Sequence, residues 1–396
     1  MTYAGRASIQ ANYVDFAREA TTPLLLPTPE PQYLFAQMAM AGRYSLAALN
    51  SGYNSVEGFM REAAGGADLS PEMGRLARVA DMYPDVVRAV DSFGQNEGDT
   101  LKFQRLIHDV GGLTKTDREL IGNSAISTTG RSVKTEEVPV TLKEYHGPYA
   151  SGGSGVAPFE IKNFDAQYRA NKIALKSLVN SELTHDYTKW LDTTIRDEFR
   201  RSSYTTLPNS GWGDVTSFVA GGGGKFSMDQ WLRARKTLTD REWRPFTSGR
   251  YVGIVPTSFN VDMAQDYDYS KASRFHEDGR NLIFGYIGSL QDIDFFECST
   301  TKQYAAASTV AGDKAGTVPA GVTLEEGLLI GPGAVGFGTA GAEIIPGYPE
   351  TRSMGPVVRF SDDTNFGTLA KCIWYAVHAM DCIDHRGVQR VIAQSA

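Results

Sequence analysis

One stretch of periodic apolar residues constrains the fold of this chain more than any other feature. Between residues 164 and 203, large apolar side chains recur at every fourth position, at Tyr187, Leu191, Ile195 and Phe199. Four residues are close to one helical turn, so these side chains share one face. The pattern predicts a long helix over 164–203. Asn180 and Ser181 leave open a break, at which Ser181 would cap a second segment.

The rest of the chain favours strands, turns and extended connections. Glycine is abundant, with 41 residues in 396, against an average usage of about 7%, so long helices cannot dominate. Short apolar runs at 251–255, 281–299 and 368–394 have the composition of buried strands. The last run predicts a long strand, a turn at 385–387 and a return strand. Together with the long helix, these strands predict the α+β fold class.

A second helix is expected directly after the glycine run at 221–224. Ser227 and Gln230 have the spacing of a capping box, which satisfies free N–H groups at a helix start. Pro245 is expected to end the helix. The residues expected to face inward are Trp231, Ala234 and Leu238.

The first 163 residues contain two segments without a core of their own. Residues 1–91 read as an extended arm with short helices, and its prolines at 27, 29 and 31 require extended backbone. Residues 92–163 contain strand patterns at 101–107 and 159–164 around a middle of Gly, Ser, Thr and charge. Such a hairpin is marginal alone in water, so we expect it to lie on another element or another chain.

The glycine pattern in "LLIGPGAVGFG" raises the question of a dinucleotide site. It consists of Gly331, Gly333 and Gly336. A nucleotide-binding turn needs a strand before it, a helix after it and an acidic residue about 20 positions on. Pro346 and Pro349 leave no room for the helix, and Glu350 follows them directly. We therefore interpret the pattern as a structural turn, and keep a nucleotide-dependent oxidoreductase as the enzyme alternative.

Other chemical patterns are incomplete, so the sequence predicts neither an enzyme nor a cofactor or metal site. His378, Cys382 and His385 lie close together, but zinc sites show tighter paired spacing. We interpret this group as one buried thiol among exposed polar residues. The remaining candidates lack the companion residues that their chemistry needs: Ser299 with Lys302, Ser154, Asp266 with Asp268, and His108, His146, His185 and His276.

Charge and cysteine usage exclude further classes. The net charge is −7 and the charges are interleaved, so tight binding of nucleic-acid phosphates is not expected. The three cysteines, Cys298, Cys372 and Cys382, form no paired framework, which favours free thiols in a reducing compartment. We expect neither a signal peptide nor a membrane span, and synthesis inside the cell.

The order of these parts resembles the major capsid proteins of tailed double-stranded-DNA phages, with the Hong Kong ninety-seven type of coat fold. Five short sequence segments, which we call phrases, carry the resemblance over roughly residues 85–396. They are most similar to the group named after the coliphage N-four. They are "GDTLKFQR", "VPVTLKEY", "LRARKTLTDREWRPFTSGRYVGIVPTSF", "FGYIGSLQDIDFFECS" and "LLIGPGAVGFG".

The resemblance implies a division of the chain into parts. These are an N-terminal arm (1–91), an extended hairpin loop (92–163), the spine helix of a peripheral domain (164–203), an axial domain with peripheral strands (204–365) and C-terminal strands that return to the peripheral domain (366–396). The glycine phrase would lie in the axial domain, where glycines allow tight turns. Since no long charged helical region precedes the arm, a separate scaffolding protein is expected.

The function implied by the resemblance is that of a shell subunit. It would assemble with itself as pentamers and hexamers into an icosahedral head, in the host cytoplasm, and become part of the virion. Scaffolding, portal and decoration proteins would be its partners, the DNA would be touched weakly, and no membrane would be involved. An encapsulin-like non-viral shell is the alternative. The residues expected to contact a neighbouring subunit are Leu101, Phe103, Leu142 and Tyr145.

Overall fold

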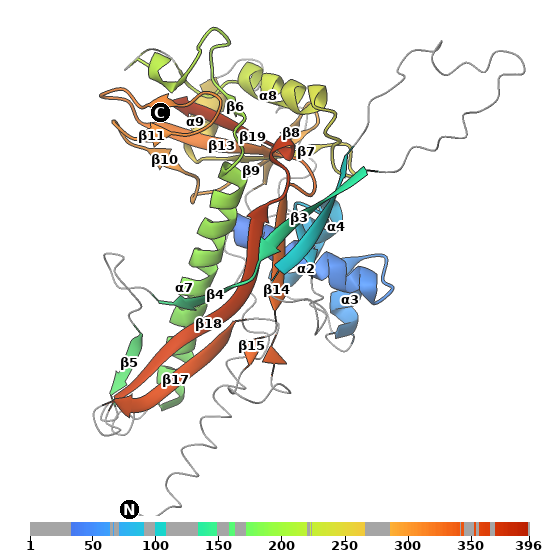
Figure 1. The fold of residues 1–396 in the computed structure, drawn as a ribbon, viewed down its shortest axis with the longest axis vertical. Helices are drawn as coiled ribbons and strands as arrows, with labels where there is room; N and C mark the ends of the chain where they lie inside the picture. The colour runs from blue at the N-terminus through green and yellow to red at the C-terminus, as the bar shows by residue number, and fades with distance from the viewer. Residues whose placement is uncertain are drawn as a thin grey trace, which may run out of the picture.

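Two β-sheets and a long helix organise the computed structural model (Figure 1). The structure describes residues 33–63, 66, 71–90, 100–107, 134–148, 158–162, 172–219, 222, 224–265, 286–340, 342–343, 352–353, 356–364 and 369–394. Within these ranges helices and strands are both well represented, so the prediction of an α+β fold class is confirmed.

The first sheet has six strands and lies along the long helix. Its order is β1-β14-β18-β17, and β4 and β5 also pair with β18. Strand β18 is therefore its central strand, and it is antiparallel to each of its partners. The strands are β1 (Val87–Val90), β4 (Lys143–Gly147), β5 (Phe159–Lys162), β14 (Val335–Ala340), β17 (Val357–Thr364) and β18 (Leu369–Cys382).

The second sheet has seven strands and forms the upper end of the molecule in Figure 1, next to α8 and α9. Its order is β6-β19-β13-β7-β9-β8, with β10 also paired to β13. The strands are β6 (Thr205–Thr206), β7 (Tyr251–Val255), β8 (Tyr286–Leu290), β9 (Ile293–Glu297), β10 (Gln303–Tyr304), β13 (Leu324–Ile330) and β19 (Val388–Gln394). The strands expected within 251–255 and 281–299 are thus confirmed.

Three small two-stranded pairs and several helices complete the described chain. The pairs are β2 (Thr100–Ile107) with β3 (Lys134–Thr141), β11 (Thr309–Val310) with β12 (Gly316–Thr317), and β15 (Ala342–Glu343) with β16 (Arg352–Ser353). The helices are α2 (Leu34–Asn50), α3 (Val56–Ala63), α4 (Pro71–Met82), α7 (Lys172–Arg200), α8 (Met228–Asp240), α9 (Ser258–Gln265) and the 3₁₀ turns η2 (Val215–Ser217) and η4 (His385–Gly387). Among the residues described, no helix combines the length and apolar composition that crossing a membrane requires.

Helix α7 confirms the predicted long helix and corrects one detail. It runs for 29 residues without a break at Asn180 and Ser181. The apolar stripe explains why, since Val179 and Leu183 are both buried and continue the four-residue spacing across the supposed break. Ser181 is exposed, so its hydroxyl does not interrupt the packing.

The main core connects the two sheets. Side chains from α2, α4 and α7 pack with Phe337 of the first sheet and with Ile254 and Leu328 of the second. A second apolar cluster lies between α8, α9 and the seven-stranded sheet. Trp231, Ala234 and Leu238 are confirmed as inward-facing residues of α8, since all three are fully buried.

Helix α8 begins with only one of the two hydrogen bonds of the expected capping box. The Ser227 side chain accepts from the Gln230 N–H at 3.4 Å, as predicted. The Gln230 amide does not bond back to Ser227 but donates to the carbonyls of Thr206 and Ile392, and so ties the helix to β6 and β19. The helix ends at Asp240, before Pro245.

The C-terminal pair of strands is the main correction to the expected topology. β18 belongs to the six-stranded sheet, whereas β19 lies in the seven-stranded sheet between β6 and β13. The turn at 385–387 is present as η4, but it passes the chain from one sheet to the other. The last strand therefore does not return along β18.

The N-terminus of α2 is capped by a residue far away in sequence. The side chain of Tyr33, at the N-cap, makes no capping hydrogen bond to the helix, and the Asp192 carboxylate of α7 instead accepts from the Ala36 N–H at 3.1 Å. The other Asp192 oxygen accepts from the Thr300 hydroxyl at 2.5 Å. Asp192 is fully buried, and burial raises its pKa even though hydrogen bonds from Thr300 and Ala36 oppose the rise.

We expect Asp192→Ala to destabilise the protein by about 1–3 kcal/mol, because the buried N–H of Ala36 loses its acceptor. Asp192→Asn keeps an acceptor oxygen, so we expect it to lose roughly half as much stability as Asp192→Ala, or less. Chemical denaturation of the two variants measures the difference. Equal losses for Ala and Asn would show that the charge, and not the acceptor, stabilises α2.

Candidate functional site

Two chain segments cross between the sheets side by side. Residues 331–334 connect β13 to β14, and residues 383–387 connect β18 to β19. The Gly331 N–H donates to the Gly387 carbonyl at 2.9 Å, and the Ile383 N–H donates to the Ala334 carbonyl at 2.8 Å. We call these two segments, with the Trp243 ring beside them, the sheet junction.

The glycines of the sheet junction serve close packing. A Cβ atom at Gly331 would lie 2.3 Å from Cδ1 of Trp243, and one at Gly387 would lie 2.7 Å from the same ring. Gly333 has a φ of +71°, which favours glycine, and its N–H donates to the Asp85 carbonyl. The segment leads into strand β14 and not into a helix, so the interpretation as a structural turn is confirmed.

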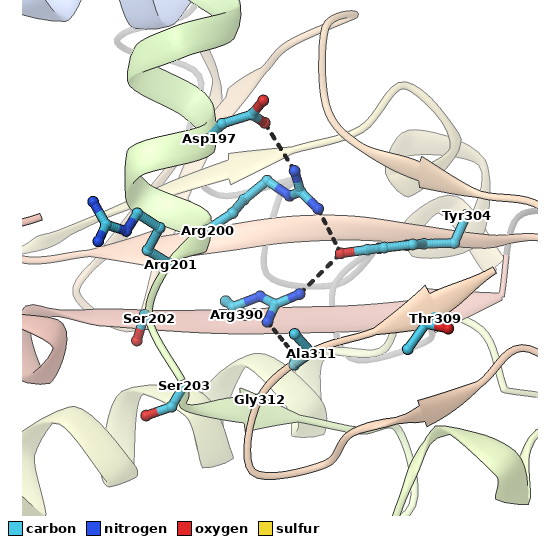
Figure 2. Close-up of a pocket in the computed structure, with 10 residues that line it drawn as sticks. All are labelled: Asp197, Arg200, Arg201, Ser202, Ser203, Tyr304, Thr309, Ala311, Gly312 and Arg390. Carbon is cyan, nitrogen blue, oxygen red and sulfur yellow. Dashed lines mark hydrogen bonds and ion pairs between the residues drawn. The ribbon is translucent and has the colours of Figure 1, made fainter. Parts of the chain in front are cut away.

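A polar cleft of about 370 Å³ lies where the last turn of α7 meets the seven-stranded sheet (Figure 2). Arg200 reaches it from α7, Arg390 from β19 and Tyr304 from β10. Both guanidinium groups donate to the Tyr304 hydroxyl, at 2.8 and 2.9 Å. The residues lining the cleft include neither His nor Cys.

Glu326 of β13 completes this arrangement and is 1% exposed. Its carboxylate accepts from Arg390 Nε at 2.6 Å, from Arg200 Nε at 3.1 Å and from the Tyr304 hydroxyl at 2.5 Å. Burial alone would raise the pKa of Glu326, but the two guanidinium groups outweigh it and hold that pKa below the usual value. These hydrogen bonds join α7, β10, β13 and β19, so the cluster ties four elements together.

A second polar group lies inside an aromatic cluster between α7 and β18. His378 Nε2 is 2.9 Å from the Tyr187 hydroxyl, and its ring lies against Trp190 and Phe337. His378 is 1% exposed, so it is not one of the exposed polar residues that the sequence suggested. Burial, with a smaller effect of Arg43, lowers the pKa of His378 to about 3.

Because His378 is buried, we expect the free energy of unfolding to decrease as the pH falls. In the unfolded chain this group takes up a proton near its ordinary pKa of 6.5, whereas the folded chain takes it up only near 3. Between these values the unfolded state holds more protons, so the free energy of unfolding decreases by about 1.4 kcal/mol per pH unit as pH falls. Denaturation between pH 6.5 and 5 should show a shallower slope for His378→Gln than for the wild type. His146→Gln, at an exposed histidine of β4, is the control, and equal slopes in all three proteins would contradict the prediction.

The thiols are buried and do not form a metal site within the described chain. None of the three cysteines forms a disulfide bond. Cys382 Sγ lies 3.5 Å from Nδ1 of His385, but in the part of the chain that the structure covers no group of three or more His, Cys, Asp or Glu could hold a metal ion. Burial raises the pKa of Cys298 to about 11 and those of Cys372 and Cys382 to about 12.

All four predicted contact residues pack, fully or in part, within the chain. Leu101 and Phe103 of β2 are 4% and 1% exposed, in a cluster with Ala379 and Ile383. The half-buried Tyr145 of β4 lies on Trp190, with ring centroids 4.7 Å apart. Leu142 is half-buried and packs against the cluster that contains Leu101 and Phe103. Contact with a neighbouring subunit stays a prediction, and it can rest only on the surface that Leu142 and Tyr145 still expose.

Those of the other sequence candidates that the structure describes do not come together as a site. Ser299 is exposed, and the Lys302 carbonyl accepts from the Glu326 N–H in the pairing of β10 with β13. His185 Nε2 is 3.2 Å from the Tyr33 hydroxyl and so faces the start of α2. Four candidates lie outside the described residues: Ser154, Asp266 with Asp268, His108 and His276.

No protein-family model and no curated protein matches the sequence. Solved structures of similar fold include the Cyanophage Pam1 capsid, with a TM-score of 0.49, 13% identity and coverage of 83% of this chain and 94% of that chain. The capsid of Ralstonia phage GP4 has a TM-score of 0.48, 12% identity and coverage of 78% and 87%. The SrpI encapsulin from Synechococcus elongatus has a TM-score of 0.41, 10% identity and coverage of 77% and 84%. The solved structures that resemble this α+β chain are mainly phage capsid proteins.

Proposed function

We propose that this chain is the major capsid protein of a tailed double-stranded-DNA phage, with a subunit of the Hong Kong ninety-seven type. The observation that carries the proposal is the match between the five phrases of the sequence and the elements of the structure. The phrases fall, in chain order, on β2, on β3 with β4, on α8 with β7, on β8 with β9 and on β13 with β14. The five phrases therefore fall on regular elements of the structure, in the order in which the resemblance gives them.

The subunit is suited to work by interfaces. The polar cleft at the end of α7 is lined by ion pairs within the chain, and α7 lies along the long strand β18 (Figure 1). In this proposal the six-stranded sheet with α7 forms the peripheral part and the seven-stranded sheet, including β19, forms the axial part. A subunit in an obligate shell is expected to bury more than about 2,000 Å² against its neighbours.

Assembly follows from this role. Copies of the chain form pentamers and hexamers that close an icosahedral head, with scaffolding, portal and decoration proteins as partners. The head is built in the host cytoplasm and becomes part of the virion. The net charge of −7 suits a shell that confines DNA with weak contacts. A non-viral compartment of encapsulin type is the alternative, supported by the same architecture.

Co-expression tests the proposal. The chain is expressed alone and with the products of the reading frames that flank its gene, and particles are examined by sedimentation and negative-stain microscopy. We expect closed shells of uniform size in at least one combination. Shells that take up a flanking enzyme and no DNA would favour the compartment alternative. A folded chain that stays monomeric in every combination would contradict both.

A further inference from the structure

Strand β13 contains two buried glutamates, Glu325 and Glu326, at 3% and 1% exposure. All seven residues of β13 are buried, and Leu324, Leu328, Leu329 and Ile330 are apolar side chains at 2% exposure or less. A carboxylate in such a strand has to be desolvated, and ion pairs with good geometry only offset that cost. Apolar residues of similar volume commonly stabilise a buried site as well or better. The ion pairs therefore contribute little net stability, and their directional geometry is the property that apolar residues could not replace.

The side chains that bond to Glu326 come from elements that approach it from different directions. Arg200 is the last residue of α7, Glu326 and Arg390 come from neighbouring strands β13 and β19, and Tyr304 from β10. Arg390 also donates to the Ala311 carbonyl at 2.5 Å and thereby holds the loop between β11 and β12. Figure 2 shows both guanidinium groups converging on the Tyr304 hydroxyl from opposite sides.

The end of α7 has a second directional tie to the same region. Arg196, one turn before Arg200, donates to the Thr300 carbonyl at 2.6 Å. Arg200 also pairs with Asp197 of its own helix at 2.8 Å, so its guanidinium group is held on both sides. Charge-assisted bonds of this kind fix direction as well as distance, whereas apolar contacts such as those of Phe199 tolerate sliding.

We propose that the cluster of Arg200, Tyr304, Glu326 and Arg390, the Glu326 cluster, fixes the angle between α7 and the seven-stranded sheet. In the shell this angle sets the orientation between the peripheral and axial parts, and so the curvature at which subunits close. The statement about shell curvature rests on the proposed function, whereas the statement about the angle between α7 and the sheet does not. The cluster is thus a positioning device within the subunit.

The test replaces the cluster by apolar residues of similar size. The variant carries Arg200→Met, Tyr304→Phe, Glu326→Leu and Arg390→Met. Spin labels are attached to Lys189→Cys on α7 and Lys236→Cys on α8, both at exposed positions. The native thiols are buried with raised pKa values, so they react slowly with the label. Pulsed electron resonance then measures the distance distribution between helix and sheet domain in the free subunit.

We expect one narrow distribution for the wild type and one that is about twofold broader for the apolar variant, because directional bonds have been lost. Arg201→Met is the matched control at the same cleft. Arg201 is 55% exposed and pairs with Glu198 of α7 and Asp381 of β18, so it makes no tie to the seven-stranded sheet. Its distribution should match that of the wild type.

Assembly provides the second measurement. The apolar variant is expected to give shells of mixed diameter or open sheets, and Arg201→Met uniform shells. An unchanged distance distribution in a folded apolar variant would overturn the proposal. If the apolar variant does not fold, Glu326→Gln, which keeps the shape and removes the charge, must broaden the distribution, or the proposal fails. If the wild type forms no shells, the proposed function fails while the distance measurement still decides the role of the cluster.

Discussion

Replacing residues 108–133 by a two-residue Asn-Gly turn is expected to give a folded subunit that builds no closed shells. Ile107 and Lys134 are register partners at the ends of β2 and β3, so a tight type I′ turn can join them without changing the pairing. The replaced segment is rich in Gly, Ser, Thr and charge, and the resemblance assigns it to the hairpin loop that reaches a neighbour. Removing it would take away the proposed contact but no part of the described core.

The structure also gives the matched control for this excision. Removing residues 108–156 instead would delete β4, which pairs with β18 over five positions, and Tyr145, which lies on Trp190. That longer excision is expected to lower the melting temperature, whereas the shorter one is not. Circular dichroism reports the fold and sedimentation reports assembly. Normal shells from the shorter variant would show that residues 108–133 make no essential contact.

Local patterns in the sequence were sufficient to predict the long helix, helix α8 and several of the strands. The four-residue stripe of α7 and the inward face of α8 depend only on helical spacing, which is a local property. The strand β19 shows the limit of such patterns. Its sequence "VQRVIAQ" indicates a buried strand, but it contains no information about which sheet it joins. Pairing with β13 depends on residues about 60 positions earlier, so the expected return along β18 was wrong.

The same limit applies to the candidate site. The two glutamates in the otherwise apolar strand β13 and the arginine in β19 are signals that could have indicated a buried ion pair. Their third partner, Arg200, lies in a helix 126 positions before Glu326, and only the packing brings it near. Leu101 and Phe103 were likewise placed correctly on a strand, while their partners, Ala379 and Ile383, could be found only from the fold.

Gly331→Ala is expected to destabilise the subunit by about 2–3 kcal/mol, a large effect for one methyl group. The new Cβ would lie 2.3 Å from the Trp243 ring, so the ring must move. Gly387 packs against the same ring, and the Trp243 carbonyl accepts from the Tyr251 hydroxyl at 2.5 Å. The ring thus lies against two glycines while the Tyr251 bond fixes the Trp243 backbone, so the ring cannot shift freely. Because the sheet junction joins the two sheets, we expect the strain to lower the stability of the whole subunit.

A double-mutant cycle with Trp243→Ala tests this explanation. Trp243→Ala alone removes packing, but adding Gly331→Ala to it should cost little, which gives a coupling energy of about 2 kcal/mol. Gly333→Ala is the control within the same turn, since no atom lies within 4 Å of its Cβ position and only its φ of +71° is strained. It should cost about 1–2 kcal/mol, and Trp243→Ala should not relieve that cost. If Trp243→Ala relieves neither substitution, the ring is not what requires glycine at position 331, and the junction is more deformable than its contacts indicate.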